Sequence, residues 1–325
     1  MFDTIDYNHA APADTLGCKV ATDTDNVVEA LLGAGVPFAA PVKAPMATIM
    51  PDGSTRVVPH RFNLVDSTGR VVGENVTERY EPIGFGEQLS VLDAIRVAGT
   101  SFNMDRVVEF DGRRIFFSVR LDGLSYDATG TGDEVTPYLW MRGSHDSSCA
   151  TQVFISLRRA HCTNQLATTK TLAKRMGLPF MSVRHTKSAH DRLRLAGEIV
   201  ANCEEIVMTQ RAIMQGLAAT PFSSTDFANF VDVLMPAPPE PMAGQPTRGY
   251  TKAMNRRELL FDLYEYGRGA HSGRGTKWQA LNAVTEYTTH HIATRGGDRE
   301  QKLFLSTIEG PAARLNEKAL ALLTA

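Results

Sequence analysis

Asp111-Gly112 is the feature of this sequence that most restricts the fold, because it separates two runs of strand-like residues, 102–110 and 113–121. A type I′ turn needs two central residues that tolerate positive φ, and Asp-Gly meets that need. In the second run alternate side chains are apolar and fall on one face of a strand: Ile115, Phe117, Val119 and Leu121. The opposite face carries Phe116, Ser118 and Arg120. The pattern predicts an antiparallel β-hairpin that buries at least one face.

Turn and periodicity signals on both sides place this hairpin in an α+β fold. The amphipathic stretch 87–98 predicts a helix that ends at Gly99, and two further strands are predicted over 136–142 and 151–159. Thr163 and Asn164 are candidate N-caps for a helix that reaches about Met176. Two more elements follow from similar signals: a hairpin around Ser67-Thr68-Gly69 and a long helix over 188–217. We therefore expect an antiparallel β-hairpin sheet packed by helices.

Proline and glycine divide the chain into four regions. Residues 1–24 are predicted to be a flexible tail, and residues 25–220 form the predicted α+β core, with a helix over 25–32 and an extended stretch over 37–59. The Pro-rich segment 236–247 is the predicted linker. The region 248–325 is predicted to be helical, with four helices near 255–266, 276–293, 299–308 and 312–323.

The overall composition excludes several classes of protein. A net charge of −2 argues against a wholly basic histone-like protein, and no window of 18 apolar residues predicts a membrane span. The acidic N-terminus has no apolar segment of the secretory type. The four cysteines are scattered without a C-x-x-C pair, which favours free thiols in a reducing cytoplasm over a disulfide scaffold or a structural zinc.

Charge is distributed unevenly along the chain, and the one basic block is the main candidate binding region. Residues 142–194 contain ten Lys and Arg, four His and only two acidic residues, whereas residues 1–141 contain 11 Lys and Arg against 20 Asp and Glu. Such clustering is typical of a protein that binds a polyanion, provided that the cations fall on one surface after folding. The nucleic-acid-binding residues expected from this block are Arg142, Arg158, Arg159, Lys170, Lys174, Arg175, Arg184, His185 and Lys187.

Motifs for catalysis are weak by comparison. The sequence has no G-x-x-x-x-G-K-[ST] motif and no G-x-S-x-G motif. His145-Asp146, with His185, could hold a metal ion in a nuclease or phosphohydrolase, although a turn that satisfies local backbone groups is the simpler interpretation. Phe116, Tyr138, Trp140 and Phe154 lie on the predicted sheet and are either core residues or base-stacking platforms. We expect no catalytic residue, no resident metal and no cofactor.

Three segments, residues 61–95, 137–166 with the following 182–188, and 275–291, together resemble the phage/plasmid-like domain-of-unknown-function family. Its members carry a Ser-His-Asp turn, an Arg-x-x-Cys-x-Asn strand end, an Arg-His-Thr loop and an Asn-Ala-Val-Thr-Glu-Tyr helix. Here these motifs stand at 144–146, 159–164, 184–186 and 282–287, and Ser147 stands where the family usually has Gly. The order helix, hairpin, strand, strand, helix over residues 87–176 is also similar in topology to single-strand annealing proteins of the Rad mediator, Redβ and RecT kind.

The resemblance and the basic block imply the same class of function. We expect a protein of phage or plasmid type that binds single-stranded DNA, with RNA left open, and anneals complementary strands in the host cytoplasm. It would act as a homo-oligomer, such as a ring, without nucleotide hydrolysis and without a membrane. Two alternatives stay open: a metal-dependent nuclease that uses His145 and Asp146, and a structural protein whose basic block binds an acidic partner.

Overall fold

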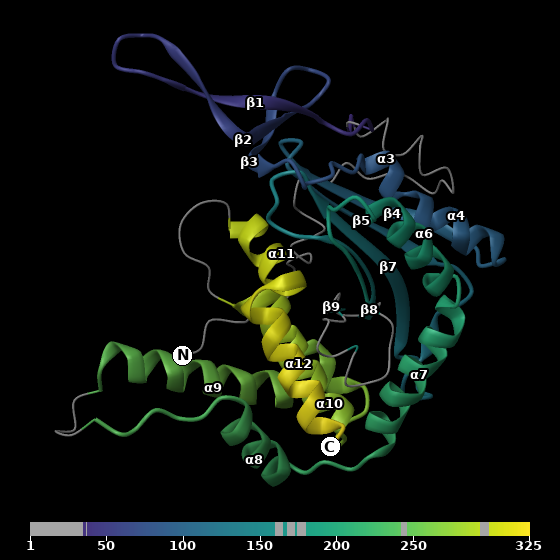
Figure 1. The fold of residues 1–325 in the computed structure, drawn as a ribbon. Helices are drawn as coiled ribbons and strands as arrows, with labels where there is room; N and C mark the ends of the chain where they lie inside the picture. Colours follow the sequence, from purple (N-terminus) through teal and green to yellow (C-terminus); the bar gives the residue numbers. More distant parts are fainter. Residues whose placement is uncertain are drawn as a thin grey trace.

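A curved antiparallel sheet is the centre of the molecule (Figure 1). The computed structural model describes residues 35–36, 38–159, 165–167, 173, 180–241, 246–292 and 299–325. The main path of the sheet runs in the order β10-β8-β7-β5-β4, with β6 paired to β7 and β9 paired to β8. The strands are β4 (Phe102–Phe110), β5 (Arg114–Leu121), β6 (Tyr126–Asp127), β7 (Glu134–Ser144), β8 (Thr151–Arg159), β9 (Gln165–Ala167) and β10 (Met181–Val183).

The central hairpin forms as its turn sequence predicts. β4 pairs with β5 from Phe102↔Leu121 to Phe110↔Arg114, and the two turn residues have φ values of 49° at Asp111 and 69° at Gly112. Both values lie in the left-handed region that a type I′ turn requires. The predicted alternation is also confirmed, because the side chains of Ile115 and Phe117 enter the largest hydrophobic cluster while Phe116 points to the opposite face.

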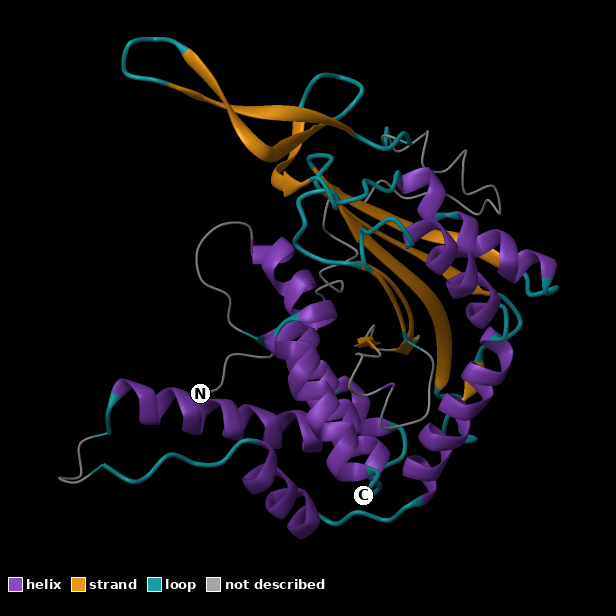
Figure 2. Cartoon of the chain, viewed as in Figure 1, coloured by secondary structure: helices purple, strands orange, loops and turns teal. Residues whose placement is uncertain are grey.

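Helices cover the first face of the sheet, where the largest hydrophobic cluster lies (Figure 2). The covering helices are α3 (Phe85–Gln88), α4 (Ser90–Val97), α6 (Ala189–Val200) and α7 (Cys203–Ala219). The single long helix expected over 188–217 is wrong in this detail, because the chain turns at Ala201-Asn202. Two shorter helices can follow the curve of the sheet, whereas one straight helix of that length would leave it (Figure 1).

The second face of the sheet carries an aromatic cluster beneath one C-terminal helix. Phe116, Trp140 and Phe154 are at most 4% exposed and pack with Phe304 of α11 (Arg299–Glu309). The Phe304 ring meets the Phe116 ring edge-on, with centroids 5.2 Å apart. These three sheet aromatics are therefore core residues, and the stacking-platform interpretation does not apply to them.

The C-terminal region is helical, as expected, and shares its core with the sheet. Its elements are α9 (Arg248–Tyr266), the 3₁₀ turn η1 (Arg268–His271), α10 (Lys277–Glu286), the π-helical turn η2 (Tyr287–His291), α11 and α12 (Pro311–Leu323). The largest cluster joins Leu157 of β8 and Met214 of α7 to Trp278 and Leu281 of α10. The Pro-rich segment therefore connects two parts that pack on each other, and a helix that the sequence analysis did not identify, α8 (Ser224–Leu234), precedes it.

A small second sheet extends away from this body. It contains β1 (Val42–Ile49), β2 (Thr55–Val65) and β3 (Val71–Thr77) in the order β1-β2-β3, and it includes the predicted hairpin around Thr68. Figure 1 shows β1 and β2 as a long ribbon that projects from the molecule. Ile49 is 77% exposed and Val57 is 64% exposed, so the outer half of the ribbon is not packed against the body.

Two predicted helices fall mostly or wholly outside the described residues. The helix over 25–32 is one of them. The helix expected from Asn164 to Met176 is the other, and its first part is wrong, because Gln165–Ala167 pairs with β8 as strand β9. In the described part of the chain no helix is long and apolar enough to cross a bilayer.

Candidate functional site

A cavity of about 580 Å³ opens between one end of the sheet and the helices α11 and α12. Arg142 near the end of β7, Gln152 at the start of β8 and Lys302 of α11 line it, together with Cys149. The antiparallel register places Arg142 directly opposite Gln152, and the Arg142 Nε donates to Gln152 Oε1 at 2.7 Å. None of the described residues that line the cavity is Asp or Glu. The arrangement therefore presents positive charge to an open space.

A second arginine strengthens this positive potential. Arg114 at the start of β5 pairs with Ser144, two residues beyond Arg142 on β7, and its guanidinium lies 5.3 Å from the centroid of the Phe116 ring. Burial lowers the pKa of Arg142, Cys149 acts to raise it, and the charge of Arg114 acts to lower it. Two guanidinium groups held close together repel each other, so an anion between or beside them would stabilise both. This end of the sheet is suited to a phosphate group.

Arg158 lies on the same face as Arg142 but at the other end of the sheet. Arg158 stands six positions after Gln152 along β8, which corresponds to roughly 20 Å. A β-bulge turns Asp105 onto this face, where its carboxylate accepts from Arg106 Nε at 2.6 Å and lies 4.0 Å from Arg158 Nη1. Arg158 also lies over the Tyr138 ring, 5.9 Å from its centroid. Asp105 therefore offsets part of the positive charge here, unlike at the Arg142 end.

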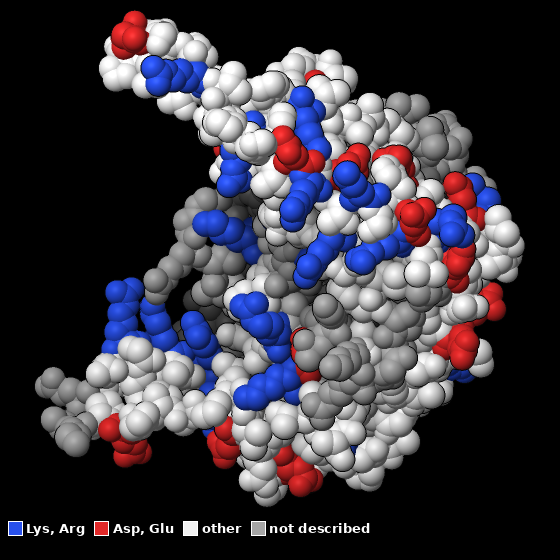
Figure 3. All heavy atoms as spheres, in the orientation of Figure 1, with Lys and Arg blue, Asp and Glu red and all other residues white. Residues whose placement is uncertain are grey.

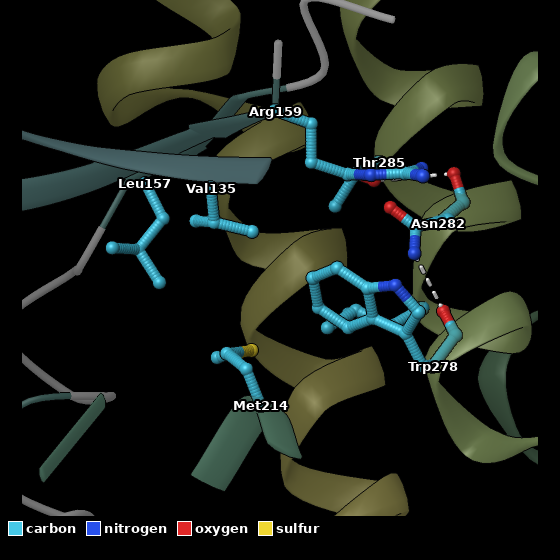
Figure 4. A pocket seen from close by; sticks show the side chains of 8 residues that line it. Val135, Leu157, Arg159, Met214, Trp278, Asn282 and Thr285 are labelled. Atoms are coloured by element: carbon cyan, nitrogen blue, oxygen red, sulfur yellow. Dashed lines mark hydrogen bonds between the residues drawn. The ribbon is translucent and has the colours of Figure 1, made fainter. Parts of the chain in front are cut away.

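Arg159 points to the opposite face and belongs to the core. Its side chain is 3% exposed, and Nε donates to Asp133 Oδ1 at 2.7 Å. Asp133 Oδ2 accepts from the indole nitrogen of Trp278, also at 2.7 Å, and the guanidinium lies 5.5 Å from the Trp278 ring. Figure 4 shows Arg159 and Trp278 beside a small void of about 20 Å³ with Met214 and Leu157. A buried, paired arginine cannot contact a passing polynucleotide, so Arg159 lies outside the candidate surface.

The segment after β10 brings two exposed cations to the Arg142 end of the sheet. Val183 pairs with Thr151 at the start of β8, and Arg184 and Lys187 follow it as exposed side chains. His185 between them is 7% exposed, stacks on the Tyr80 ring at 5.0 Å and lies 3.3 Å from Thr151 Oγ1. Burial lowers the pKa of His185 to about 4, so it is neutral near pH 7. Arg184 and Lys187 remain candidates, whereas His185 holds the loop in place.

Lys170, Lys174 and Arg175 lie outside the described residues, as does the motif residue Asn164.

His145 has a structural position at the turn after β7. Its side chain stacks on Phe85 at 4.1 Å, and Nδ1 and Nε2 each lie 3.0 Å from a backbone carbonyl oxygen, those of Gly112 and Ile83. The ring thereby ties the β4–β5 turn to the segment before α3. Because both nitrogens face these oxygens, neither ring nitrogen is directed at a metal ion. Asp146 closes the turn by accepting from the Ser148 amide at 2.9 Å.

This geometry favours the local-turn interpretation of the Ser-His-Asp motif. Ser147, which replaces the usual Gly of the resemblance, has a φ of 61°, a conformation that Gly adopts more easily than Ser. Over the described residues no three His, Cys, Asp or Glu side chains gather in a way that could hold a metal ion.

The sequence analysis overlooked cations outside the basic block. Lys302 joins the cavity from a helix more than a hundred residues away from Arg142. Arg248, Lys252 and Arg256 follow each other at four-residue steps along α9, and all three are exposed. Figure 3 shows Lys and Arg side chains around the hollow between α9 and the α11 region, while many Asp and Glu lie toward the outer rim of this view. The four-residue spacing on α9 was the signal available in the sequence.

One comparison with known proteins identifies a family. Residues 73–307 match the family model described as "Domain of unknown function (DUF932)", and this range includes the Ser144–Asp146 turn and the Arg184–Thr186 loop. No curated protein and no solved structure matches the chain. Because the family model spans well over half of the 325 residues, the chain belongs to the DUF932 family.

Proposed function

We propose that this protein binds single-stranded DNA and, as a homo-oligomer, anneals complementary strands without nucleotide hydrolysis. The observation that carries the proposal is the cavity beside Arg142. Arg142 and Lys302 line it, Arg114 lies next to it, and its described lining has no carboxylate. The exposed Arg184 and Lys187 lie at the same end of the sheet.

The chemistry of these side chains favours phosphate over other anionic groups on a macromolecule. An arginine presents a planar fork of donors that matches two phosphate oxygens, and a lysine adds a point charge. Phosphate contacts give affinity without sequence preference, which an annealing protein needs because it must accept any strand. Bases would then face away from the cations and remain free to pair.

The edge strands of the two sheets support the formation of an oligomer. β4 ends the main path of the seven-stranded sheet and β1 ends the three-stranded sheet. Such edges offer backbone groups to a neighbouring subunit. An annealing protein benefits from this assembly because several copies hold a longer stretch of one strand.

Fluorescence anisotropy with a labelled 15-nucleotide strand tests the binding step. We expect micromolar or tighter binding at low salt, with an affinity that falls as salt rises. The double variant Arg142→Gln/Lys302→Gln should lower the slope of log K against log salt by about 1.4, since each lost single-strand phosphate contact removes roughly 0.7. Lys302→Gln alone should cause about half of that decrease in slope. Because Lys302 is exposed on α11, this variant does not disturb the sheet.

A matched control removes the same charge elsewhere. Arg192→Gln/Arg194→Gln changes two exposed side chains of α6, on the helix-covered face of the sheet. We expect its salt slope to equal that of the wild type. Absence of binding by the wild-type protein at low salt, or an equal change in both double variants, would refute the proposed site. Annealing is then measured with two complementary labelled strands in the absence of ATP.

A further inference from the structure

Outside the proposed site, the most informative feature is helix α9, whose side chains change along its length from exposed and basic to buried and packed. The side chains at four-residue steps on this helix are, in order, Arg248, Lys252, Arg256, Leu260 and Tyr264. Each step of four residues turns the helix by about 40°, so the three cations share one side while the series has wound about 160° by Tyr264. Leu260 and Tyr264 are 0% and 3% exposed, whereas the three cations before them are exposed. The first half of α9 therefore presents basic side chains to solvent, and its second half packs on the body.

The three cations, named here the α9 stripe, have no carboxylate between them, and Glu258, two residues after Arg256, does not lie beside it on the helix. Between Arg248 and Arg257 the helix contains no Asp or Glu, and Arg257 is occupied by Asp232 and by backbone carbonyls of Val231 and Met235. Arg248 lies in the first turn of α9, at the positive end of the helix dipole, where a cation lowers helix stability. The charge of Arg248 is therefore better matched to an external anion than to the helix itself.

Helix α9, which carries the α9 stripe, borders the same hollow as α11, the helix that supplies Lys302 (Figures 1 and 3). Arg256 is close enough to η2 for its charge to lower the pKa of Tyr287, which burial raises. Helix α9 contacts η2, and η2 contacts α11, the helix that supplies Lys302. Figure 3 shows blue side chains on both sides of this hollow in one view of the molecule.

We infer that the α9 stripe is a second phosphate-binding segment, which holds the same single strand beyond the Arg142 cavity. This inference rests on the proposed function. Its three side chains are about 6 Å apart along the helix, and the stripe covers about 12 Å. That length accommodates two to three consecutive phosphates of an extended strand. The substrate is thus a polynucleotide long enough to reach from the sheet to α9, rather than a mononucleotide or a short oligonucleotide.

The test compares two strand lengths with one triple variant. Arg248→Gln/Lys252→Gln/Arg256→Gln should bind a 30-nucleotide strand with a salt slope lowered by about 2, because three single-strand phosphate contacts are lost. Its binding to a strand of three nucleotides, no longer than the stripe itself, should stay within twofold of the wild type. The control Arg192→Gln/Arg194→Gln/Arg211→Gln removes three exposed charges from α6 and α7 and should leave both slopes unchanged. A thermal melt should show the α9 variant to be at least as stable as the wild type.

The outcomes separate this inference from the function on which it rests. Wild-type protein that binds neither strand refutes the proposed function and the inference together. If the wild-type protein binds and the α9 variant shows the same salt slope with the 30-nucleotide strand, only the inference is refuted. The same is true if the α6–α7 control lowers the slope as much as the α9 variant does. Vesicles with anionic lipid are included as a third ligand, and loss of vesicle binding without loss of strand binding would assign the stripe to a membrane surface instead.

Discussion

Asp133→Asn tests how the sheet is joined to the C-terminal helices. Asp133 is 2% exposed and accepts two hydrogen bonds of 2.7 Å, one from Arg159 Nε and one from the Trp278 indole nitrogen. An asparagine of the same shape keeps one carbonyl oxygen and replaces the other oxygen with an amino group. Because both neighbours are donors, one of the two hydrogen bonds becomes a contact between two donors. The guanidinium also loses its partner charge.

The expected cost is large because the charge left behind is buried. Removing one partner of a buried ion pair costs about 3–5 kcal/mol. Glu286 is 1% exposed and its charge also acts on Arg159, so part of the compensation remains and the lower end of this range applies. For a chain of 325 residues, about 1 kcal/mol corresponds to about 1.5 °C in the melting temperature. We therefore expect the melting temperature to fall by about 4–5 °C.

Thermal and urea unfolding measure this change, and two further variants control it. Asp93→Asn removes a carboxylate that is 74% exposed and should leave the midpoint unchanged. Adding Arg159→Met to Asp133→Asn removes the unpaired charge and should recover part of the lost stability, because the two sites are in direct contact. If Asp133→Asn and Asp93→Asn melt together, the buried pair does not hold the two parts of the molecule, and the reasoning fails.

Three further predictions follow from single contacts. Stability should decline as the pH falls from about 6.5 to about 4, because the unfolded chain binds a proton on His185 more tightly than the folded chain does. His185→Phe keeps a ring stacked on Tyr80 and should flatten this decline, as measured by urea unfolding at a series of pH values. Gly73→Ala should destabilise the protein by about 1–3 kcal/mol, since its Cβ would lie 2.3 Å from the carbonyl oxygen of His145. Gly216→Ala, in open space on α7, should instead stabilise it by about 0.5–1 kcal/mol, and equal signs for the two glycines would contradict the packing argument. Cys149 is a free thiol that lines the cavity, so a bound oligonucleotide should slow its labelling by a thiol reagent. Peptide mass mapping measures the labelling rate, and an unchanged rate would place the strand elsewhere.

Local sequence signals were enough for most of the sheet, because its strands are formed by turns close in the chain. The Asp111-Gly112 turn specifies one hairpin, and the predicted strand over 151–159 agrees with β8 at both ends. The break between α6 and α7 was missed because the apolar spacing continues across Ala201-Asn202. β9 was missed because its pairing with β8 depends on the sheet edge rather than on its own residues.

The candidate site was harder to predict, because it depends on which face of the sheet each side chain occupies. Arg158 and Arg159 are neighbours in the chain but point to opposite faces, so Arg158 is 23% exposed whereas Arg159 is buried against Trp278. Lys302 reaches the cavity only through the packing of α11 on the sheet. Counting charge along the sequence could not separate these cases.

The projecting ribbon of β1 and β2 has a consequence for hydrogen exchange. A two-stranded ribbon is marginally stable by itself, and from the Ala47–Val57 pair outward this one has only its own cross-strand pairs. Its outer amides should therefore exchange with deuterium through local opening, long before those of β5 and β7, which exchange only when the whole sheet opens. A ligand that grips the ribbon would be revealed by slowed exchange there, even where the melting temperature of the body does not change.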